Sequence, residues 1–101
     1  MYWNLTEKER LVTAFTLAAS DKELMENFLN DLLTEKELKE LIMRLHIMCL
    51  LKDCASYKKI SEYTGASPST IARLAKKVDK RKSGFQEIIR KFEKLGKAYS
   101  D

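Results

Sequence analysis

The stretch SYKKISEYTGASPSTIARLAKKV, residues 56–78, decides how this chain folds. Its apolar residues stand at the offsets that lock two short helices together: Ile60, Ala66, Ile71 and Leu74. Ser61 is small where the two helices come closest, and Gly65 tolerates the positive φ of a tight turn. Ser67-Pro68 begins the second helix, because proline at the first helical position gives up no hydrogen bond. The pattern predicts a helix-turn-helix over about 56–78.

The rest of the chain also reads as helix, because its one proline and three glycines all lie in the second half. In a capping box, a Ser or Thr side chain accepts from the N–H three residues on and a Glu or Gln side chain reaches back. Such boxes occur at Thr6/Glu9, Ser20/Glu23 and Thr34/Glu37. Apolar residues at helical spacing follow each of them. Three helix starts are therefore predicted before the helix-turn-helix.

The third of these helices is predicted to be the longest and to form the centre of the core. Its expected apolar stripe is Leu38, Leu41, Ile42, Leu45, Met48 and Cys49. Ser83 with Gln86 is a weaker box that opens a last helix, whose stripe is Phe85, Ile88, Ile89, Phe92 and Leu95. We expect an all-α fold of about six helices in a single domain, residues 1–101.

Charge is distributed unevenly along the 101 residues. Residues 1–56 carry seven Lys/Arg and ten Asp/Glu, a net charge of −3, whereas residues 57–101 carry twelve and five, a net charge of +7. A basic half favours a polyanion as partner, although a solvated lysine surface has the same composition. No run approaches the roughly 18 apolar residues of a membrane span, and residues 1–10 lack the features of a signal peptide. We expect a cytoplasmic protein.

The second helix of the pair has the composition of a recognition helix, with hydroxyls at its start and cations further along. Ser and Thr can bond base edges and phosphates in the major groove, and Arg can pair with guanine. Lys58 and Lys59 on the first helix would lie over the DNA backbone and give affinity and register. The predicted DNA-binding residues are Lys58, Lys59, Ser67, Pro68, Ser69, Thr70, Ala72, Arg73, Lys76 and Lys77.

From Phe28 to Leu74 the sequence resembles the trp-repressor superfamily, and most closely its YerC/YecD-like branch. The matching parts are the Asp31-Leu32-Leu33-Thr34 opening, Glu37-Leu38, Arg44-Leu45, Thr64-Gly65-Ala66-Ser67, Thr70-Ile71 and Arg73. The resemblance implies an intertwined, all-helical homodimer that places its two reading helices in successive major grooves. Dimerisation would involve about 6–53 and 84–98.

The tryptophan-sensing members of that superfamily hold the amino acid in a pocket with two arginines and a threonine. Arg44, Arg73 and Thr34 match these positions and would form a vestigial ligand pocket. The glycine that follows the second arginine in those members is Leu74 here, and a leucine should fill the space of the indole. The resemblance therefore implies DNA binding without tryptophan, with no cofactor and no small-molecule corepressor.

Weaker patterns indicate other chemistry. The residues that could suggest a metal site are His46, Cys49 and Cys54. Zinc is usually bound by about four ligands, so we expect these residues to lie in the core or at its edge and to bind no metal. A single histidine leaves no reserve base for a catalytic set, and the chain has no glycine-rich phosphate loop, so no enzyme is expected. The basic face of the last helix, with Arg90, Lys91 and Lys94, is interpreted as part of a packed helix and not as a membrane-surface element.

The sequence thus predicts a homodimeric regulator that binds double-stranded DNA in the major groove, with repression favoured over activation because no polymerase-contacting surface can be identified. Two other functions stay open. The chain could be a helical protein-interaction or scaffold module that keeps the helix-turn-helix, or it could bind structured RNA.

Overall fold

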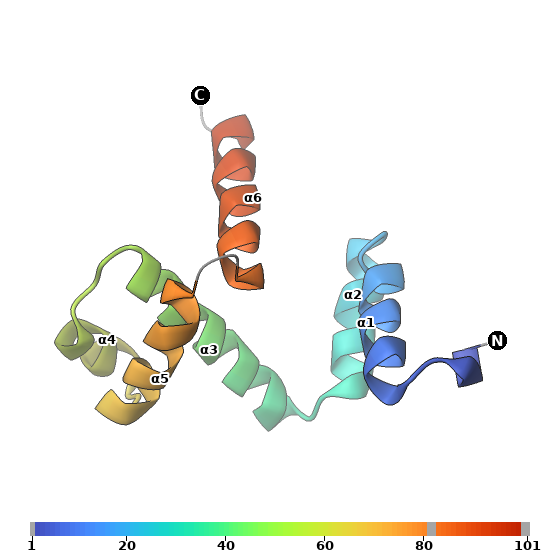
Figure 1. Ribbon diagram of the computed structural model, residues 1–101, viewed down its shortest axis with the longest axis horizontal. Coiled ribbons are helices and arrows are strands. Elements are labelled where there is room, and N and C mark those ends of the chain that lie inside the picture. Colours follow the sequence, from blue (N-terminus) through green and yellow to red (C-terminus); the bar gives the residue numbers. More distant parts are fainter. Residues whose placement is uncertain (1, 81–82, 100–101) are drawn as a thin grey trace. The chain divides into compact units, whose positions relative to one another are not determined.

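The computed structural model describes residues 2–80 and 83–99, and the described part is built of helices with no strand. A short 3-10 turn, η1 (Tyr2–Asn4), precedes α1 (Glu7–Ala18), α2 (Lys22–Leu32) and α3 (Glu35–Lys52). The helices α4 (Tyr57–Thr64), α5 (Pro68–Asp79) and α6 (Gly84–Tyr99) follow (Figure 1). The predicted all-α fold of about six helices is confirmed, whereas η1 was not predicted.

The helix starts follow the capping residues closely. Thr6 and Glu9 form a reciprocal box with both N···O distances at 3.1 Å, and Thr34 and Glu37 form another at 2.9 and 3.1 Å. The predicted cap of α2 is wrong by one residue, because Asp21 and not Ser20 accepts from the amides of the first turn. A carboxylate accepts these bonds and also complements the positive end of the helix dipole.

The chain divides into two compact units, residues 1–40 and 41–101. In the first unit, α1 and α2 pack against each other, and the Phe15 and Phe28 rings meet edge to face with centroids 5.4 Å apart. Ala18 is buried, and the Arg10 guanidinium lies over the Trp3 ring, 5.4 Å from its centroid.

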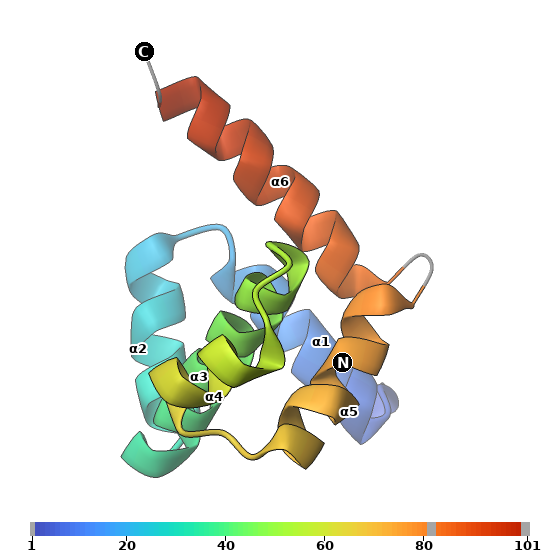
Figure 2. The ribbon, with the colours of Figure 1, turned by 90° about the vertical axis from the view of Figure 1, so that its left-hand side faces the viewer.

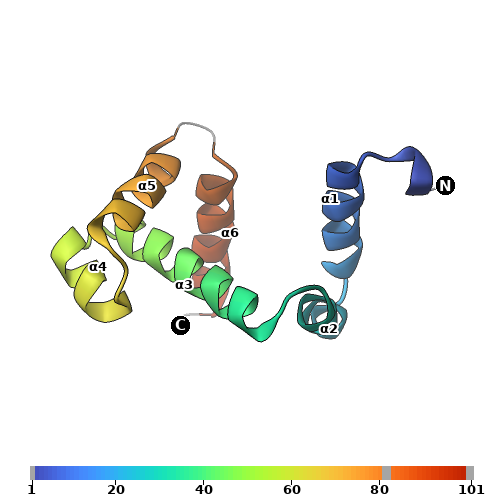
Figure 3. The same cartoon turned by 90° about the horizontal axis from the view of Figure 1, so that it is seen from below.

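The second unit has its core where α4 and α5 pack against α3. Four buried side chains form this core: Ile47, Ile60, Ile71 and Leu74. Met48, Leu50 and Leu51 of α3 pack around it, together with two alanines of the connections. Figure 3 shows the short connection between α4 and α5, and Figures 1 and 2 show α6 leaving α5 and projecting away from it.

The predicted stripe of α3 is wrong in part. Ile47 is buried and was missing from the predicted stripe, whereas Leu41, Ile42 and Leu45 are exposed. Apolar residues surround this helix on several sides, so helical periodicity alone does not select the face that packs against α4 and α5.

Helix α3 ends in a left-handed turn at Cys54, whose φ is 63°. The Cys54 amide donates to the Leu51 carbonyl and the Ala55 amide to the Leu50 carbonyl, both at 3.0 Å. This pair of bonds is the Schellman motif, in which glycine or asparagine usually takes the left-handed position. The motif turns the chain from α3 into Ser56, which caps α4.

Candidate nucleic-acid interface

The pair α4–α5 is held as one piece by its buried side chains. Ile60 of α4 and Ile71 of α5 are fully buried, and Leu74 is 3% exposed. Burying a Leu or Ile side chain stabilises a fold by about 1.5–3 kcal/mol, so these three residues fix how α5 is presented. Their predicted role as locking contacts agrees with their burial.

The turn between the two helices is fixed by side-chain hydroxyls as well as by its glycine. Gly65 has a φ of +74°, and its amide donates to the Ser61 carbonyl at 2.8 Å. The Ser61 hydroxyl donates to the Ala66 carbonyl at 2.9 Å. Thr64 donates its hydroxyl to the Ile60 carbonyl at 2.7 Å and accepts from the Ala66 amide at 3.2 Å. The turn therefore satisfies its polar groups internally, and α5 starts from a defined point.

The sequence predicts Ser61 only as a small residue where the two helices come closest, and it predicts no role in the turn for the Thr64 hydroxyl. Each of these hydroxyls bonds backbone within a few residues, as Ser and Thr commonly do at turns. The pattern Ser-x-x-Thr-Gly was the available signal, because it places both hydroxyls within reach of the turn.

The first turn of α5 carries three hydroxyls that contact one another. Ser67 caps the helix, with its Oγ accepting from the Thr70 amide at 3.2 Å. The same Oγ donates to Thr70 Oγ1 at 2.9 Å and lies 3.1 Å from Ser69 Oγ. Because Ser67 supplies its own proton to Thr70, the Thr70 hydroxyl proton stays available for another acceptor. Ser67 is thus a structural cap. With the Ser67 proton on Thr70, the Ser69 hydroxyl donates to Ser67 and keeps its lone pairs for a donor of the ligand, whereas Thr70 keeps its proton for an acceptor.

Helix α5 has two chemically distinct faces. Its buried face consists of Ile71, Leu74, Ala75 and Val78. Ser69, Arg73 and Lys76 lie on the opposite face at i, i+4 and i+7 and are exposed. Of the other predicted contacts, Pro68 and Lys77 are exposed, and Thr70 and Ala72 are half-buried at the edges of the face.

Helix α4 adds a second basic surface to the unit. Lys58 and Lys59 are both exposed. Tyr63, which sequence reasoning did not select, is 79% exposed and lines a hollow together with Lys59 and Glu62. Residues 56–80 contain six Lys/Arg and two Asp/Glu. This excess of positive charge attracts a polyanion at long range.

The residues of the predicted vestigial pocket have different settings. Thr34 lies in the first unit, and its hydroxyl and amide are both used in capping α3. Arg44 and Arg73 lie in the second unit, and both are exposed. Leu74 contributes to the core with Ile47, Ile60 and Ile71.

The possible metal ligands do not form a site in the described residues, where no group of three or more His, Cys, Asp and Glu side chains could hold a metal ion. His46 and Cys54 are exposed, and Cys49 is half-buried. Burial raises the pKa of the Cys49 thiol, and the neighbouring charge of Asp53 raises it further. No described helix is long and apolar enough to span a membrane.

Two short helices joined by the three-residue turn Gly65-Ala66-Ser67, with a basic face on the second helix, are typical of the helix-turn-helix class. The chain matches the family model described as "Trp repressor protein" over residues 7–93. It belongs to that family of regulators. The match extends the resemblance seen at 28–74 back into α1 and forward through most of α6.

A relative is the "Uncharacterized protein YerC" of Bacillus subtilis (strain 168), 38% identical over 58 residues. The matched part is 57% of this chain and 56% of YerC, so the chain spans just over half the length of this curated relative. The likeness to YerC agrees with the branch indicated by the sequence. No solved structure matches the chain significantly.

Proposed function

We propose that this protein is a transcription regulator, acting as a repressor, that binds a specific double-stranded DNA site by placing α5 in the major groove. The observation that carries the proposal is the division of α5 into a buried apolar face and an exposed face of Ser69, Arg73 and Lys76. A helix whose inner face is used for packing can offer its outer face to a ligand without unfolding. The width of the major groove admits one α-helix.

The side chains divide into two roles by chemistry and position. Ser69, Thr70 and Arg73 stand in the first half of α5, where a recognition helix meets base edges. Arg73 can form a bidentate pair with guanine, and a good pair of this kind discriminates by about 1–3 kcal/mol. Lys58 and Lys59, on the neighbouring helix, are suited to phosphates, which fix register and carry no sequence information.

The protein would act as a homodimer, with dimerisation through about 6–53 and 84–98 in a single domain that spans 1–101. Support comes from large apolar side chains that are exposed in both units. They include Leu11, Val12 and Leu17 of α1, Leu24 of α2, Ile42 of α3, and Ile88, Phe92 and Leu95 of α6. Surfaces of this kind mark interaction sites. Sedimentation equilibrium should give twice the monomer mass of 11.7 kDa, and a monomer at micromolar concentration would contradict the proposal.

DNA binding would be independent of tryptophan, since Leu74 belongs to the core and would compete with an indole for space. Thr34, Arg44 and Arg73 would then be the remnant of a ligand pocket without a small-molecule corepressor. We expect no thermal shift with L-tryptophan. A saturable shift of several degrees would overturn this part of the proposal.

Selection of bound duplexes from a random DNA pool, read by sequencing, tests the function directly. We expect a palindromic motif, because a two-fold dimer reads two related half-sites. No enrichment together with no salt-dependent binding to unrelated duplex would favour a protein-interaction scaffold, since phosphate contacts make DNA affinity fall with salt. Stronger binding to structured RNA than to duplex DNA would favour an RNA ligand. We also propose that the protein is cytoplasmic, because it must reach its DNA ligand.

Two variants and a control test the assigned roles on the selected site. Arg73→Ala should weaken binding to that site by about 1–3 kcal/mol and relax preference at one base pair. Lys58→Ala should weaken binding to all duplexes by a similar factor and lower the salt slope by about one. Lys36→Ala removes the same charge from the exposed surface of α3, outside α4 and α5, and should change little. Equal losses on every sequence for Arg73→Ala and Lys58→Ala would contradict the division of roles.

A further inference from the structure

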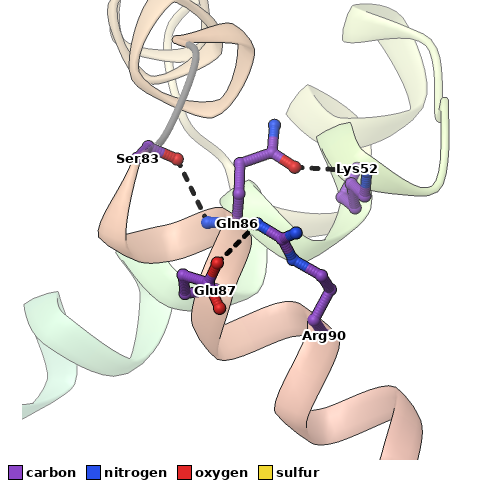
Figure 4. Close-up of polar contacts among 5 residues, drawn as sticks. All are labelled: Lys52, Ser83, Gln86, Glu87 and Arg90. Atoms are coloured by element: carbon purple, nitrogen blue, oxygen red, sulfur yellow. Dashed lines mark hydrogen bonds and ion pairs between the residues drawn. The ribbon is translucent and has the colours of Figure 1, made fainter.

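One side chain, that of Gln86 near the start of α6, joins three helices of the second unit. Its Oε1 accepts from Lys52 Nζ at the end of α3, at 3.4 Å. Its Nε2 donates to the carbonyl oxygen of Val78 in the last turn of α5. Its own backbone amide donates to Ser83 Oγ at 3.1 Å, which caps α6 (Figure 4).

The Val78 carbonyl needs such a donor from outside its helix. The last four carbonyls of an α-helix have no partner within the helix, and α5 ends at Asp79. The following residue, Lys80, has φ −65° and ψ 129°, so the chain leaves α5 in an extended conformation and not through a left-handed cap. Val78 itself is buried. Gln86 therefore supplies a C-terminal cap to α5 from another helix.

The use of Gln86 differs from that of the equivalent residues in α1 and α3. Glu9 and Glu37 stand at the same third position of their helices, and each turns back to the amide of its own N-cap residue. A glutamine at this position can do the same. In α6 the Ser83 hydroxyl still caps the Gln86 amide, but the glutamine side chain extends to the two neighbouring helices instead.

Few apolar side chains of α6 are buried against the rest of the second unit, so these polar contacts contribute more to holding α6 in position. Among the described side chains of α6, only Ile89 is buried. We call the two side-chain hydrogen bonds of Gln86, to Lys52 and to Val78, the joint. A hollow of about 390 Å³ opens beside it and is lined in part by Gln86, Ile89 and Lys80. The nearby Arg90–Glu87 ion pair, at 2.7 Å, lies within α6 alone and bridges no two helices.

We infer that Gln86 is a positioning residue that holds the last turn of α5, with Lys76 and Lys77, in place against α3 and α6. As far as DNA reading is concerned, this inference rests on the proposed function. Loss of the joint frays the end of the reading helix and shifts the two lysines from the positions in which they would meet phosphates. Gln86 acts through these two lysines and does not itself contact DNA.

Amide hydrogen exchange of the full chain tests the joint without any ligand. Gln86→Met keeps the side-chain length and removes both bonds, whereas Gln86→Glu keeps an acceptor for Lys52 but cannot donate to Val78 when ionised. Both variants should speed exchange in the last turn of α5 by about 3- to 10-fold, the effect of one hydrogen bond. Glu87→Gln, one residue away, should leave this turn unchanged. If the amides in the last turn of α5 exchange at the same rate in Gln86→Met as in Glu87→Gln, the inferred joint is wrong.

Affinity for the DNA site selected by the wild-type chain tests the positioning role. Gln86→Met should weaken binding by about 3- to 10-fold with an unchanged salt slope, because the frayed turn must first be reordered, after which Lys76 and Lys77 make the same phosphate contacts in the complex. Lys77→Ala should lower the slope by about one. Faster exchange with wild-type affinity would overturn the role in reading while the joint stands. If the wild-type chain binds no duplex, the proposed function and the reading role both fall, and hydrogen exchange alone decides the joint.

Discussion

Replacing Gly65 with alanine should destabilise the second unit by about 1 kcal/mol through the backbone alone. Gly65 has a φ of +74°, and a Cβ built at this position has no atom within 4 Å. An alanine therefore meets no steric obstacle from its surroundings, and only its own backbone conformation is unfavourable. The position isolates the conformational contribution of one residue to the turn before the reading helix.

The magnitude follows from two opposing contributions. Holding an L-residue in the left-handed region costs roughly 1–2 kcal/mol. Alanine also lowers the entropy of the unfolded chain, which stabilises the fold by about 0.4–1 kcal/mol. The net loss is about 1 kcal/mol. Gly65→Asn should lose less, because asparagine enters this region more readily. Gly96→Ala, inside α6 and also with open space around it, should have the opposite sign, since alanine is the better helix former.

Urea denaturation followed by far-ultraviolet circular dichroism gives the three free energies of unfolding. A change of midpoint at constant slope reports stability and not a changed unfolded state, and 1 kcal/mol corresponds to a shift of about 4–8 °C in melting temperature. Equal losses for Gly65→Ala and Gly65→Asn would refute the reasoning, because the positive φ could not then be the cause. A Gly65→Ala variant as stable as wild type would refute it as well.

Three further outcomes follow from the caps and thiols. Cys54→Gly should stabilise the chain by about 0.5–1 kcal/mol in the same urea assay, because Cys54 holds φ 63° at the end of α3; a loss would show that the thiol itself is needed there. Hydrogen bonds from the Thr34 backbone and side chain lower the pKa of Glu37. The free energy of unfolding of wild type should therefore exceed that of Glu37→Gln at neutral pH, and this difference should disappear as pH falls through the lowered pKa. A constant difference would contradict this sign. Iodoacetamide should modify Cys54 before Cys49, since burial raises the pKa of Cys49 and only the thiolate reacts; mass spectrometry of the partly labelled protein would show the reverse order if this is wrong.

The helices and the turn could be predicted from sequence because their causes are local. A cap acts across three residues, as in Thr6/Glu9 and Thr34/Glu37, and Gly65 acts through its own φ. The same local reasoning misplaced the start of α2, where Ser20 and Asp21 stand side by side and the carboxylate is the better cap. Local chemistry therefore fixes the elements to within a residue or so.

The contacts that depend on neighbouring helices could not be predicted in this way. Ile47 was overlooked because α3 is apolar on several sides, and only the positions of α4 and α5 select the buried side. Gln86 was predicted to complete a cap with Ser83, and half of that box forms. Its side chain instead bonds Val78 and Lys52, which are 8 and 34 residues away. A preference for this arrangement arises only when three helices meet.

The two faces of α5 connect the fold to the proposed function. Ile71 and Leu74 are buried, so truncation of either is expected to lower stability by about 2–5 kcal/mol and to reduce DNA binding only through unfolding. Ser69 and Arg73 make no contribution to that core, so their truncation should alter binding with stability kept within about 0.5 kcal/mol of wild type. Plotting affinity against stability for the four alanine variants would separate the two groups. If Arg73→Ala lost affinity only in proportion to lost stability, the exposed face would not be the reading surface.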